Sequence, residues 1–187
     1  MPGFVKPFNG ILSILLLLWV MPGLAGLYAT QIRQASLIKN DAEFNIQTKI
    51  DYLLSPTAKE ALHKGVPLFW TVWLEIREVG LLWDQCIHRQ KLPYRLKFHA
   101  LLNQYEVLSG STHAEMFLSL NAALNYMSAL TAAAPVSQAL LQSGRRYKLA
   151  VKSRFERELL PVPLRPFAYL DSQWFLSSDW YIWPLQE

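Results

Sequence analysis

Apolar and polar residues alternate along much of the chain after residue 30. In residues 42–53, and again in residues 66–79, apolar side chains occupy every second position. A period of two is typical of a β-strand that buries one face and exposes the other. We therefore predict two half-buried strands, and we expect the more weakly alternating stretch from Gln31 to Lys39 to pair with the first of them.

Shorter alternating pieces follow in the middle of the chain. Residues 81–90 predict a strand that turns at Lys91-Leu92-Pro93 into a second strand of residues 94–102. Residues 103–117 have the pattern of another hairpin, turning at Ser109-Gly110-Ser111. We expect sequential antiparallel strands throughout this region.

The C-terminal part predicts two more strands. Residues 144–158 alternate again, and the aromatic residues 172–185 close the chain as a last strand. Between them, Pro161, Pro163 and Pro166 exclude a central strand, because proline cannot donate a backbone hydrogen bond to a neighbouring strand.

Two segments carry helix signals instead. Ser55 suits the N-cap of a short helix, with Pro56 at its first position and Gly65 just past its end. Residues 119–133 have a 3.6-residue apolar period, and we expect Ser119 to be the cap, although a capping box of Thr112 and Glu115 would start that helix earlier. Together the elements predict a mainly β fold, all-β or α+β: an antiparallel β-sandwich or partly open barrel with one amphipathic and one short helix.

The N-terminus has the pattern of an export signal. Lys6 precedes the apolar run Ile11–Met21, Pro22 then breaks any helix, and Gly23 and Ala25 stand at the spacing that signal peptidase accepts. We predict a cleaved signal peptide over residues 1–25, with an uncleaved anchor as the alternative. The remaining residues 30–187 suit a single β-rich extracytoplasmic domain, periplasmic or tethered to the outer face of the inner membrane.

Composition indicates the kind of core and limits the kinds of partner that the chain predicts. Seven Trp, eight Tyr and nine Phe suit the half-buried surface of sheets, and the single cysteine, Cys86, excludes an intramolecular disulfide. A net charge of +4 is too small to predict nucleic-acid binding. We expect Trp174, Trp180 and Trp183 to be core residues, with an interfacial rim as the alternative.

The chain contains no strong catalytic or metal-binding motif. Cys86 and His88 share one face of their predicted strand, and the predicted turn at Pro93 would bring His99 or Lys97 opposite them, a set suited to zinc or to nucleophilic chemistry. The simpler interpretation is an interior cysteine with two solvated histidines. We therefore expect no enzymatic activity, no catalytic or metal site and no cofactor, and we expect acidic residues such as Glu75 to be solvated.

Basic residues follow alternate positions of two predicted strands. If the two strands were neighbours, their outer face would form a positive surface for an anionic lipid headgroup or an acidic partner. The simpler interpretation is that outward strand positions are ordinarily charged. The residues of this candidate binding surface are Arg95, Lys97, His99, Arg146, Lys148, Lys152 and Arg154.

Four segments together resemble a known bacterial family. They read EALHKGVPLFWTVWLEI, FHALLNQYEV, MFLSLNAALNYM and LLPVPLRPFAYLDSQWFLSSDWYIWPL, in that order. The chain from about residue 30 to its C-terminus is similar to the domain-of-unknown-function family forty-three-ninety, exported proteobacterial proteins of unassigned activity. The resemblance implies no active site. It does imply a setting beside a sensor histidine kinase of the nitrogen-regulation type.

Three functional hypotheses follow. The first is an exported, non-enzymatic interaction or sensing module, accessory to a membrane sensor histidine kinase, that binds a protein partner through its exposed aromatic or basic surface. The second is a cell-envelope structural or lipid-associated protein that uses the basic residues and the Trp-rich terminus at an anionic membrane surface. The third is a metal- or thiol-dependent hydrolase built on Cys86, His88 and His99. We favour the first, and we identify no nucleic-acid or small-molecule partner.

Overall fold

The structure is a computed structural model, and it describes residues 28–40, 43–110, 113–130 and 133–185. The predicted signal peptide, with the candidate cleavage site at Ala25, lies outside these residues. The strands are β1 (Gln31–Asn40), β2 (Glu43–Asp51), β3 (Leu68–Glu78), β4 (Gln85–His99), β5 (Gln104–Ser109), β6 (His113–Phe117), β7 (Val136–Ser137), β8 (Tyr147–Phe155) and β9 (Tyr181–Leu185). The helices are α2 (Pro56–His63), α3 (Leu120–Ser128) and α4 (Arg165–Leu170).

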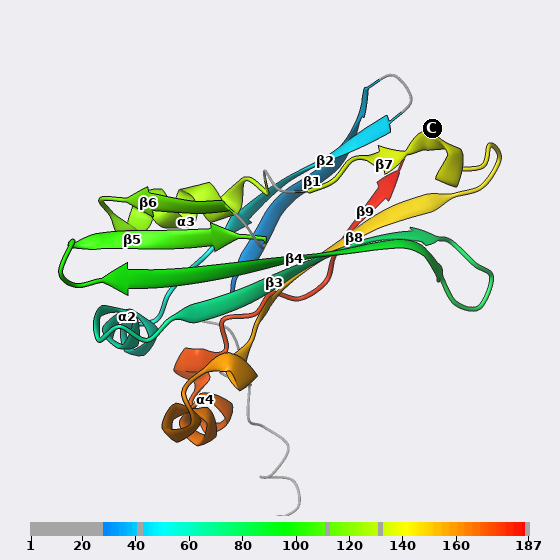
Figure 1. The fold of residues 1–187 in the computed structure, drawn as a ribbon. Coiled ribbons are helices and arrows are strands. Elements are labelled where there is room, and N and C mark those ends of the chain that lie inside the picture. Colours follow the sequence, from blue (N-terminus) through cyan, green and yellow to red (C-terminus); the bar gives the residue numbers. More distant parts are fainter. Residues whose placement is uncertain (1–27, 41–42, 111–112, 131–132, 186–187) are drawn as a thin grey trace, which may run out of the picture.

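The strands form two antiparallel sheets, so the predicted mainly β fold is confirmed. One sheet has three strands in the order β1-β2-β7, and the other has six in the order β6-β5-β4-β3-β8-β9 (Figure 1). Helix α3 contacts β2 of the small sheet and β5 of the large one, while β1 contacts β8 and β9. Neither sheet closes into a barrel within the described residues.

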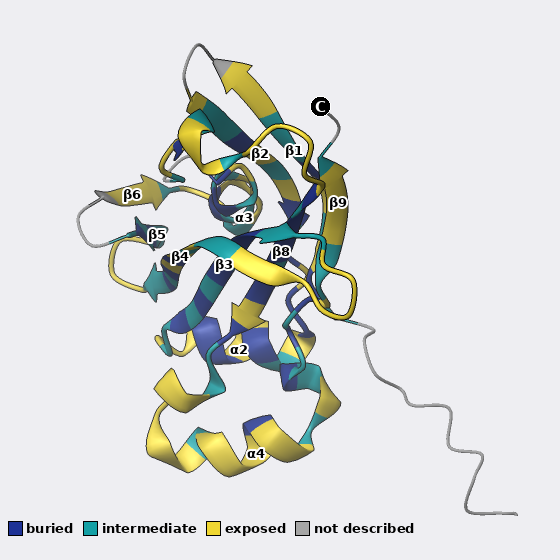
Figure 2. Ribbon diagram, turned by 90° about the vertical axis from the view of Figure 1, so that its right-hand side faces the viewer, coloured by how far each residue is buried: buried dark blue, intermediate teal, exposed yellow. Residues whose placement is uncertain are grey.

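The strand of residues 66–79 was predicted correctly and is the centre of the fold. In β3, the side chains of Leu68, Val72, Leu74 and Ile76 are all fully buried, and that of Trp70 is 1% exposed. They belong to one hydrophobic core that also takes residues from the small sheet, α2 and α3. Figure 2 shows the buried residues concentrated where the elements face one another, while most of α4 is exposed.

Both predicted helices begin at the predicted caps. The Ser55 hydroxyl accepts a hydrogen bond from Ala58 N over 3.1 Å, and Gly65 ends that helix with a φ of 85°. A left-handed conformation of this kind favours glycine. The Ser119 hydroxyl caps α3 by accepting from Ala122 N over 3.2 Å. The earlier start is therefore wrong, and the helix ends at Ser128 rather than near residue 133.

The turn predicted at Lys91-Leu92-Pro93 does not exist. β4 runs without interruption from Gln85 to His99, and the connection to β3 lies at residues 79–84. The strand tolerates Pro93 because of where its nitrogen points. The N and C=O of one strand residue point to the same side. The Pro93 carbonyl accepts from Gly110 N over 2.9 Å, so the nitrogen also points toward the loop that follows β5, and its missing hydrogen removes no hydrogen bond between paired strands.

The last predicted strand is shorter than expected. Only Tyr181–Leu185 pairs as β9, and the residues before it are held to β8 by serine side chains. Ser178 Oγ accepts from Ser153 N over 2.8 Å, and Ser177 Oγ accepts from Phe155 N over 2.9 Å. Helix α4 was not predicted. Within the described ranges, no helix has the length and apolar character needed to span a membrane.

Candidate functional site

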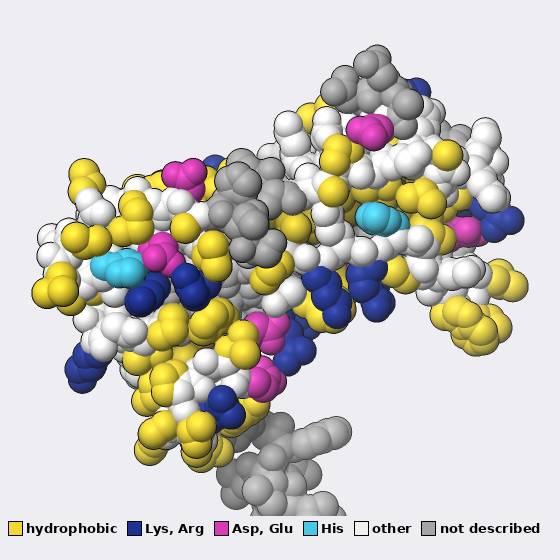
Figure 3. All heavy atoms as spheres, viewed as in Figure 1, with side chains coloured by type: hydrophobic (Ala, Val, Ile, Leu, Met, Phe, Trp, Pro, Cys, Tyr) yellow, Lys and Arg dark blue, Asp and Glu magenta, His cyan; other side chains and the backbone are white. Residues whose placement is uncertain are grey.

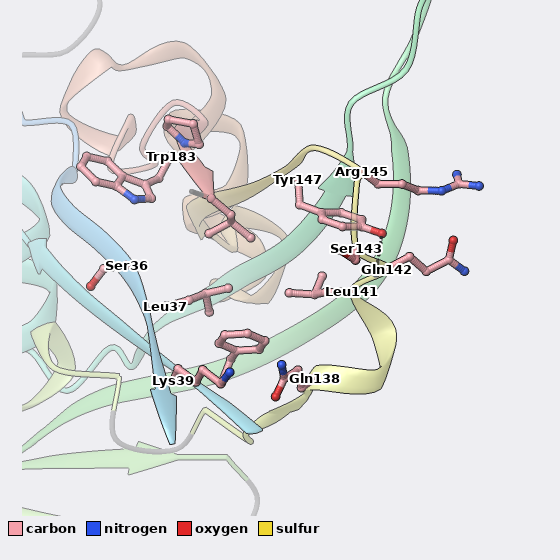
Figure 4. Close-up of a pocket in the computed structure, with 13 residues that line it drawn as sticks. Ser36, Leu37, Lys39, Gln138, Leu141, Gln142, Ser143, Arg145, Tyr147 and Trp183 are labelled. Atoms are coloured by element: carbon pink, nitrogen blue, oxygen red, sulfur yellow. Dashed lines mark hydrogen bonds between the residues drawn. The ribbon is translucent and has the colours of Figure 1, made fainter. Parts of the chain in front are cut away.

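A cleft of about 850 Å³ opens at the edges of the two sheets. It lies between β1 and β2 on one side and β9 on the other, and the chain between β7 and β8 closes one end (Figure 4). Its volume falls within the range of about 300–1,000 Å³ that is usual for binding sites. The cleft is therefore large enough to be a candidate binding site.

Strand alternation explains why the cleft is apolar on its small-sheet side. Leu37 points to the same face of β1 as the fully buried Ala35. In the register of the two strands, Leu37 stands opposite Ile46 and Lys39 opposite Phe44. Figure 4 shows the Leu37 side chain directed toward Leu141 on the far side. The inner face of the small sheet thus continues into the cleft as a floor.

The large sheet supplies aromatic residues to the opposite wall. Trp183 stands opposite the buried Leu149 in the β8–β9 register, so its ring lies on the inner face, yet it stays 43% exposed. The Tyr147 ring is 7% exposed, and its hydroxyl accepts a hydrogen bond from Gln142 N over 3.0 Å. This bond ties the loop before β8 to the cleft wall.

The rim of the cleft is polar and cationic. It comprises Ser36, Lys39, Gln138, Gln142, Ser143 and Arg145. Arg145 forms an ion pair with Glu78, and its side chain extends away from the apolar residues in Figure 4. Lys39 is exposed and forms no ion pair among the described residues. A ligand would therefore meet an apolar floor, neutral hydrogen-bonding groups and one free positive charge.

The two basic stripes predicted from the sequence do not lie side by side. β3 separates β4 from β8, so the condition for a continuous positive surface is not met. Most of their charges are neutralised locally: Arg154 pairs with Glu158 over 2.9 Å, and Lys148 pairs with Asp84. Of the seven residues, Lys97, Arg146 and Lys152 form no ion pair within the described ranges.

Arg95 and His99 share one acceptor. Arg95 Nη2 lies 2.5 Å from Glu106 Oε1, and His99 Nε2 lies 2.8 Å from Oε2. Desolvation alone would raise the pKa of the Glu106 carboxyl, but the hydrogen bonds and charges of Arg95 and His99 outweigh it and lower the pKa below its usual value. This cluster is a structural feature of the β4–β5 pair.

The outer face of the large sheet combines cations with tryptophans. Lys91 Nζ lies 4.0 Å from the ring centre of Trp73, and the Arg77 guanidinium lies 4.5 Å from that of Trp180. Such contacts stabilise both partners. Of the three C-terminal tryptophans predicted to be core, only Trp174 is buried, at 2% exposed. Trp180 instead covers the outer face, and Trp183 lines the cleft.

Glu75 was expected to be solvated, and that prediction is wrong. Its carboxylate is held by two arginines of the same sheet face, Arg77 at 2.7 Å and Arg89 at 2.7 Å, and the residue is only 3% exposed. The sequence offered no sign of this, because Arg89 reaches Glu75 only through the register of β3 with β4.

The predicted set of Cys86, His88 and His99 is not brought together. All three lie on β4, and 11 residues of strand at about 3.3 Å each place the two histidines roughly 35 Å apart. A bulge pairs His88 with Ile76 and Cys86 with Arg77, so the two residues also face opposite sides. Within the described residues, no group of three or more His, Cys, Asp and Glu side chains is placed to hold a metal.

Sequence reasoning missed the cleft itself. Leu37, Phe44, Leu141 and Trp183 come from four separate segments, and none of them carries a motif. The only usable signal was the alternation that places the first two on one face of their sheet. The stretch around Leu141 reads in the sequence as an ordinary polar loop.

A comparison with protein-family models finds a match over residues 28–184, to the model described as "Domain of unknown function (DUF4390)". Neither the curated proteins nor the solved structures include a significant match to the chain. The family match agrees with the resemblance seen in the sequence, and it covers almost every described residue.

Proposed function

Because the chain belongs to the DUF4390 family of domains of unknown function, we propose its function from its own surface: a non-enzymatic interaction module that binds an extended, apolar peptide segment of a partner protein in the cleft. The observation that carries this proposal is the cleft's construction, with an apolar floor between two edge strands and a polar rim. The sensing or accessory role suggested by the family resemblance is compatible with such a module.

The apolar residues of the cleft supply the expected core of an interface. Leu37, Phe44 and Leu141 meet there with the rings of Tyr147 and Trp183. Aromatic residues are enriched where protein interfaces concentrate their binding energy. Because Trp183 is 43% exposed without a partner, a bound apolar side chain would remove further ring area from water.

The rim and the strand edges favour a peptide over an acyl chain. β1 and β9 are the outermost strands of their sheets, so each offers an edge to which an extended peptide can hydrogen-bond. Gln138 and Gln142 add side-chain donors and acceptors at the rim. An acyl chain would use none of these groups and would leave the open, polar part of the cleft unfilled.

The charge of the rim limits the peptide further. Lys39 is exposed without an ion pair within the described ranges, whereas Arg145 is already paired with Glu78. We therefore expect an acidic residue of the peptide beside Lys39. An acidic residue there gains a positive neighbour, although an exposed pair of this kind contributes only about 0.2–1 kcal/mol. The charge would select among apolar peptides more than it strengthens binding.

The direct test is photocross-linking from two adjacent positions of β9. A photoreactive phenylalanine replaces Trp183, which lines the cleft, or Ile182, which is 41% exposed on the opposite face of the strand. In cells of the native host, the full chain should cross-link a partner from position 183 and not from position 182. A membrane sensor histidine kinase is the first partner to seek by mass spectrometry, because the family resemblance suggests that class.

A binding measurement then assigns the interaction to the cleft. With the captured segment as a synthetic peptide, Phe44→Ala and Leu37→Ser should weaken binding at least tenfold, while Ile182→Ala should leave it unchanged. The cleft would be excluded as the binding site if both β9 positions cross-linked equally. It would also be excluded if neither cleft variant changed the affinity for the peptide.

A further inference from the structure

The turn between β3 and β4 ends in three consecutive exposed apolar residues. Leu81 is 101% exposed, Leu82 81% and Trp83 78%. Figure 3 shows apolar side chains standing out from the body at this end of the long hairpin. Large apolar side chains that protrude together, with no described residue covering them, mark an interaction surface.

The backbone of the tip has a defined conformation. A Cβ on Gly80 would lie 2.0 Å from the carbonyl oxygen of Trp83, so the chain closes on itself in a way that only glycine permits. At the base of the hairpin, Val79 N donates to Arg146 O over 2.8 Å, and the β3–β4 pairing continues to Glu78 and Gln85. The apolar residues are therefore presented on a paired stem.

Cations surround the base of the tip. Lys148 pairs with Asp84 and Arg145 with Glu78, while Arg146 forms no ion pair among the described residues. Arg77 shares the carboxylate of Glu75 with Arg89, so this group also has one more cation than it has anions. Positive charge thus exceeds negative charge just behind the three apolar side chains.

We propose that the tip Leu81-Leu82-Trp83 inserts into the interfacial region of an anionic bilayer while the basic residues at its base contact the headgroups. The three apolar side chains lie at the end of the hairpin, beyond the ion pairs of Glu78 and Asp84. Interfacial segments insert only about 5–10 Å, so a short apolar turn can reach that depth. Tryptophan favours this region, and each nearby cation is attracted to anionic lipid.

Shape distinguishes this occupant from a protein partner. A typical protein interface has an apolar centre surrounded by a polar rim, and both fit against a complementary surface. Here the apolar residues lie at the end of a projecting turn, and the charges lie behind them. The arrangement fits an anionic bilayer, which is deformable, apolar in its interior and negatively charged at its surface. The proposal does not require peptide binding in the cleft, although Arg145 borders both features.

The test places an environment-sensitive NBD fluorophore at either end of β4 in the full chain. Leu82→Cys and Leu101→Cys, each in a Cys86→Ser background, put the label at the tip or at the opposite turn, where Leu101 is 102% exposed. Because the label reports only its own surroundings, an insertion of residues 11–30 into the same vesicles does not mimic the signal.

Vesicles of phosphatidylcholine with 30% phosphatidylglycerol should shift the emission of the label at position 82 to the blue and raise its intensity severalfold. Brominated lipids should quench it, and the label at position 101 should not respond. Phosphatidylcholine alone, 0.5 M NaCl, or the pair Arg146→Glu and Lys148→Glu should reduce the response at least fivefold. The proposal would be overturned by no response at position 82, by an equal response at both positions, or by an equal response to neutral vesicles. A response that self-association of the protein produces without lipid would also overturn it.

Discussion

Arg89 reaches across the β3–β4 pair to Glu75, and its Nε donates a hydrogen bond to Oε1 over 2.7 Å. Arg77 Nε donates to the other oxygen over 2.8 Å, so the carboxylate is bound on both sides and only 3% exposed. On the outer face of the large sheet, this buried charge joins the two central strands.

Removing that charge should destabilise the fold. Glu75→Gln leaves two arginines facing a neutral amide, and we expect the free energy of unfolding in urea to fall by about 1–3 kcal/mol, since both arginines keep some contact with water. The matched control is Glu115→Gln on β6, an exposed carboxylate for which the change should stay within about 0.5 kcal/mol. Equal effects of the two variants would contradict the structural role of Glu75.

Glu106 should make stability depend on pH. The pKa of its carboxyl is lowered in the folded state from the ordinary 4.5, because the hydrogen bonds and charges of Arg95 and His99 outweigh desolvation. The contribution of Glu106 to the free energy of unfolding is therefore complete above pH 4.5. It is lost as the pH falls through the lower pKa of the folded state. Unfolding of the wild type and Glu106→Gln should differ by roughly 0.5–1.5 kcal/mol at pH 7, and the difference should shrink below about pH 4.5. A difference that does not shrink at all between pH 7 and pH 3 would show that Glu106 acts through packing instead.

Ser178 should matter for the C-terminal segment. Its hydroxyl accepts from Ser153 N over 2.8 Å, and both residues are buried, so Ser178→Ala leaves a backbone donor without its acceptor. We expect a loss of about 1–3 kcal/mol in thermal or urea unfolding and faster hydrogen exchange of the Ser153 amide. Ser172→Ala, at an exposed position, is the control and should change neither measurement. Unaltered exchange at Ser153 would mean that water replaces the hydroxyl.

Cys86 should be dispensable. It is exposed, and the one hydrogen bond of its Sγ among the described residues goes to the backbone oxygen of His88, over 3.4 Å. We expect Cys86→Ser to unfold within about 0.5 kcal/mol of the wild type and to bind the cleft peptide equally. The wild-type thiol should react with a maleimide in the folded protein, because it is exposed. A hyperreactive thiol, or zinc retained by the wild type and lost from the variant, would revive the hydrolase hypothesis.

Local patterns predicted most of the secondary structure. The alternation of β3 determines which of its residues are buried, and Ser55 and Ser119 determine where two helices begin, because a cap and a strand period act through near neighbours in the chain. The mainly β class followed from the same signals. Pro93 led to the wrong prediction of a turn, because the cost of a proline in a strand depends on what faces its nitrogen, and only the position of β5 decides that.

The candidate sites depended on pairing and packing between distant segments. Strand order placed β3 between the two basic stripes, and register placed Arg89 beside Glu75. The cleft needed Leu37 and Trp183, 146 positions apart in the chain, to meet at two sheet edges. A sequence determines by itself what each residue prefers over a few neighbours. Which strands become neighbours, and where their edges stay open, is settled by the burial of the whole core at once, and only the tertiary structure shows it.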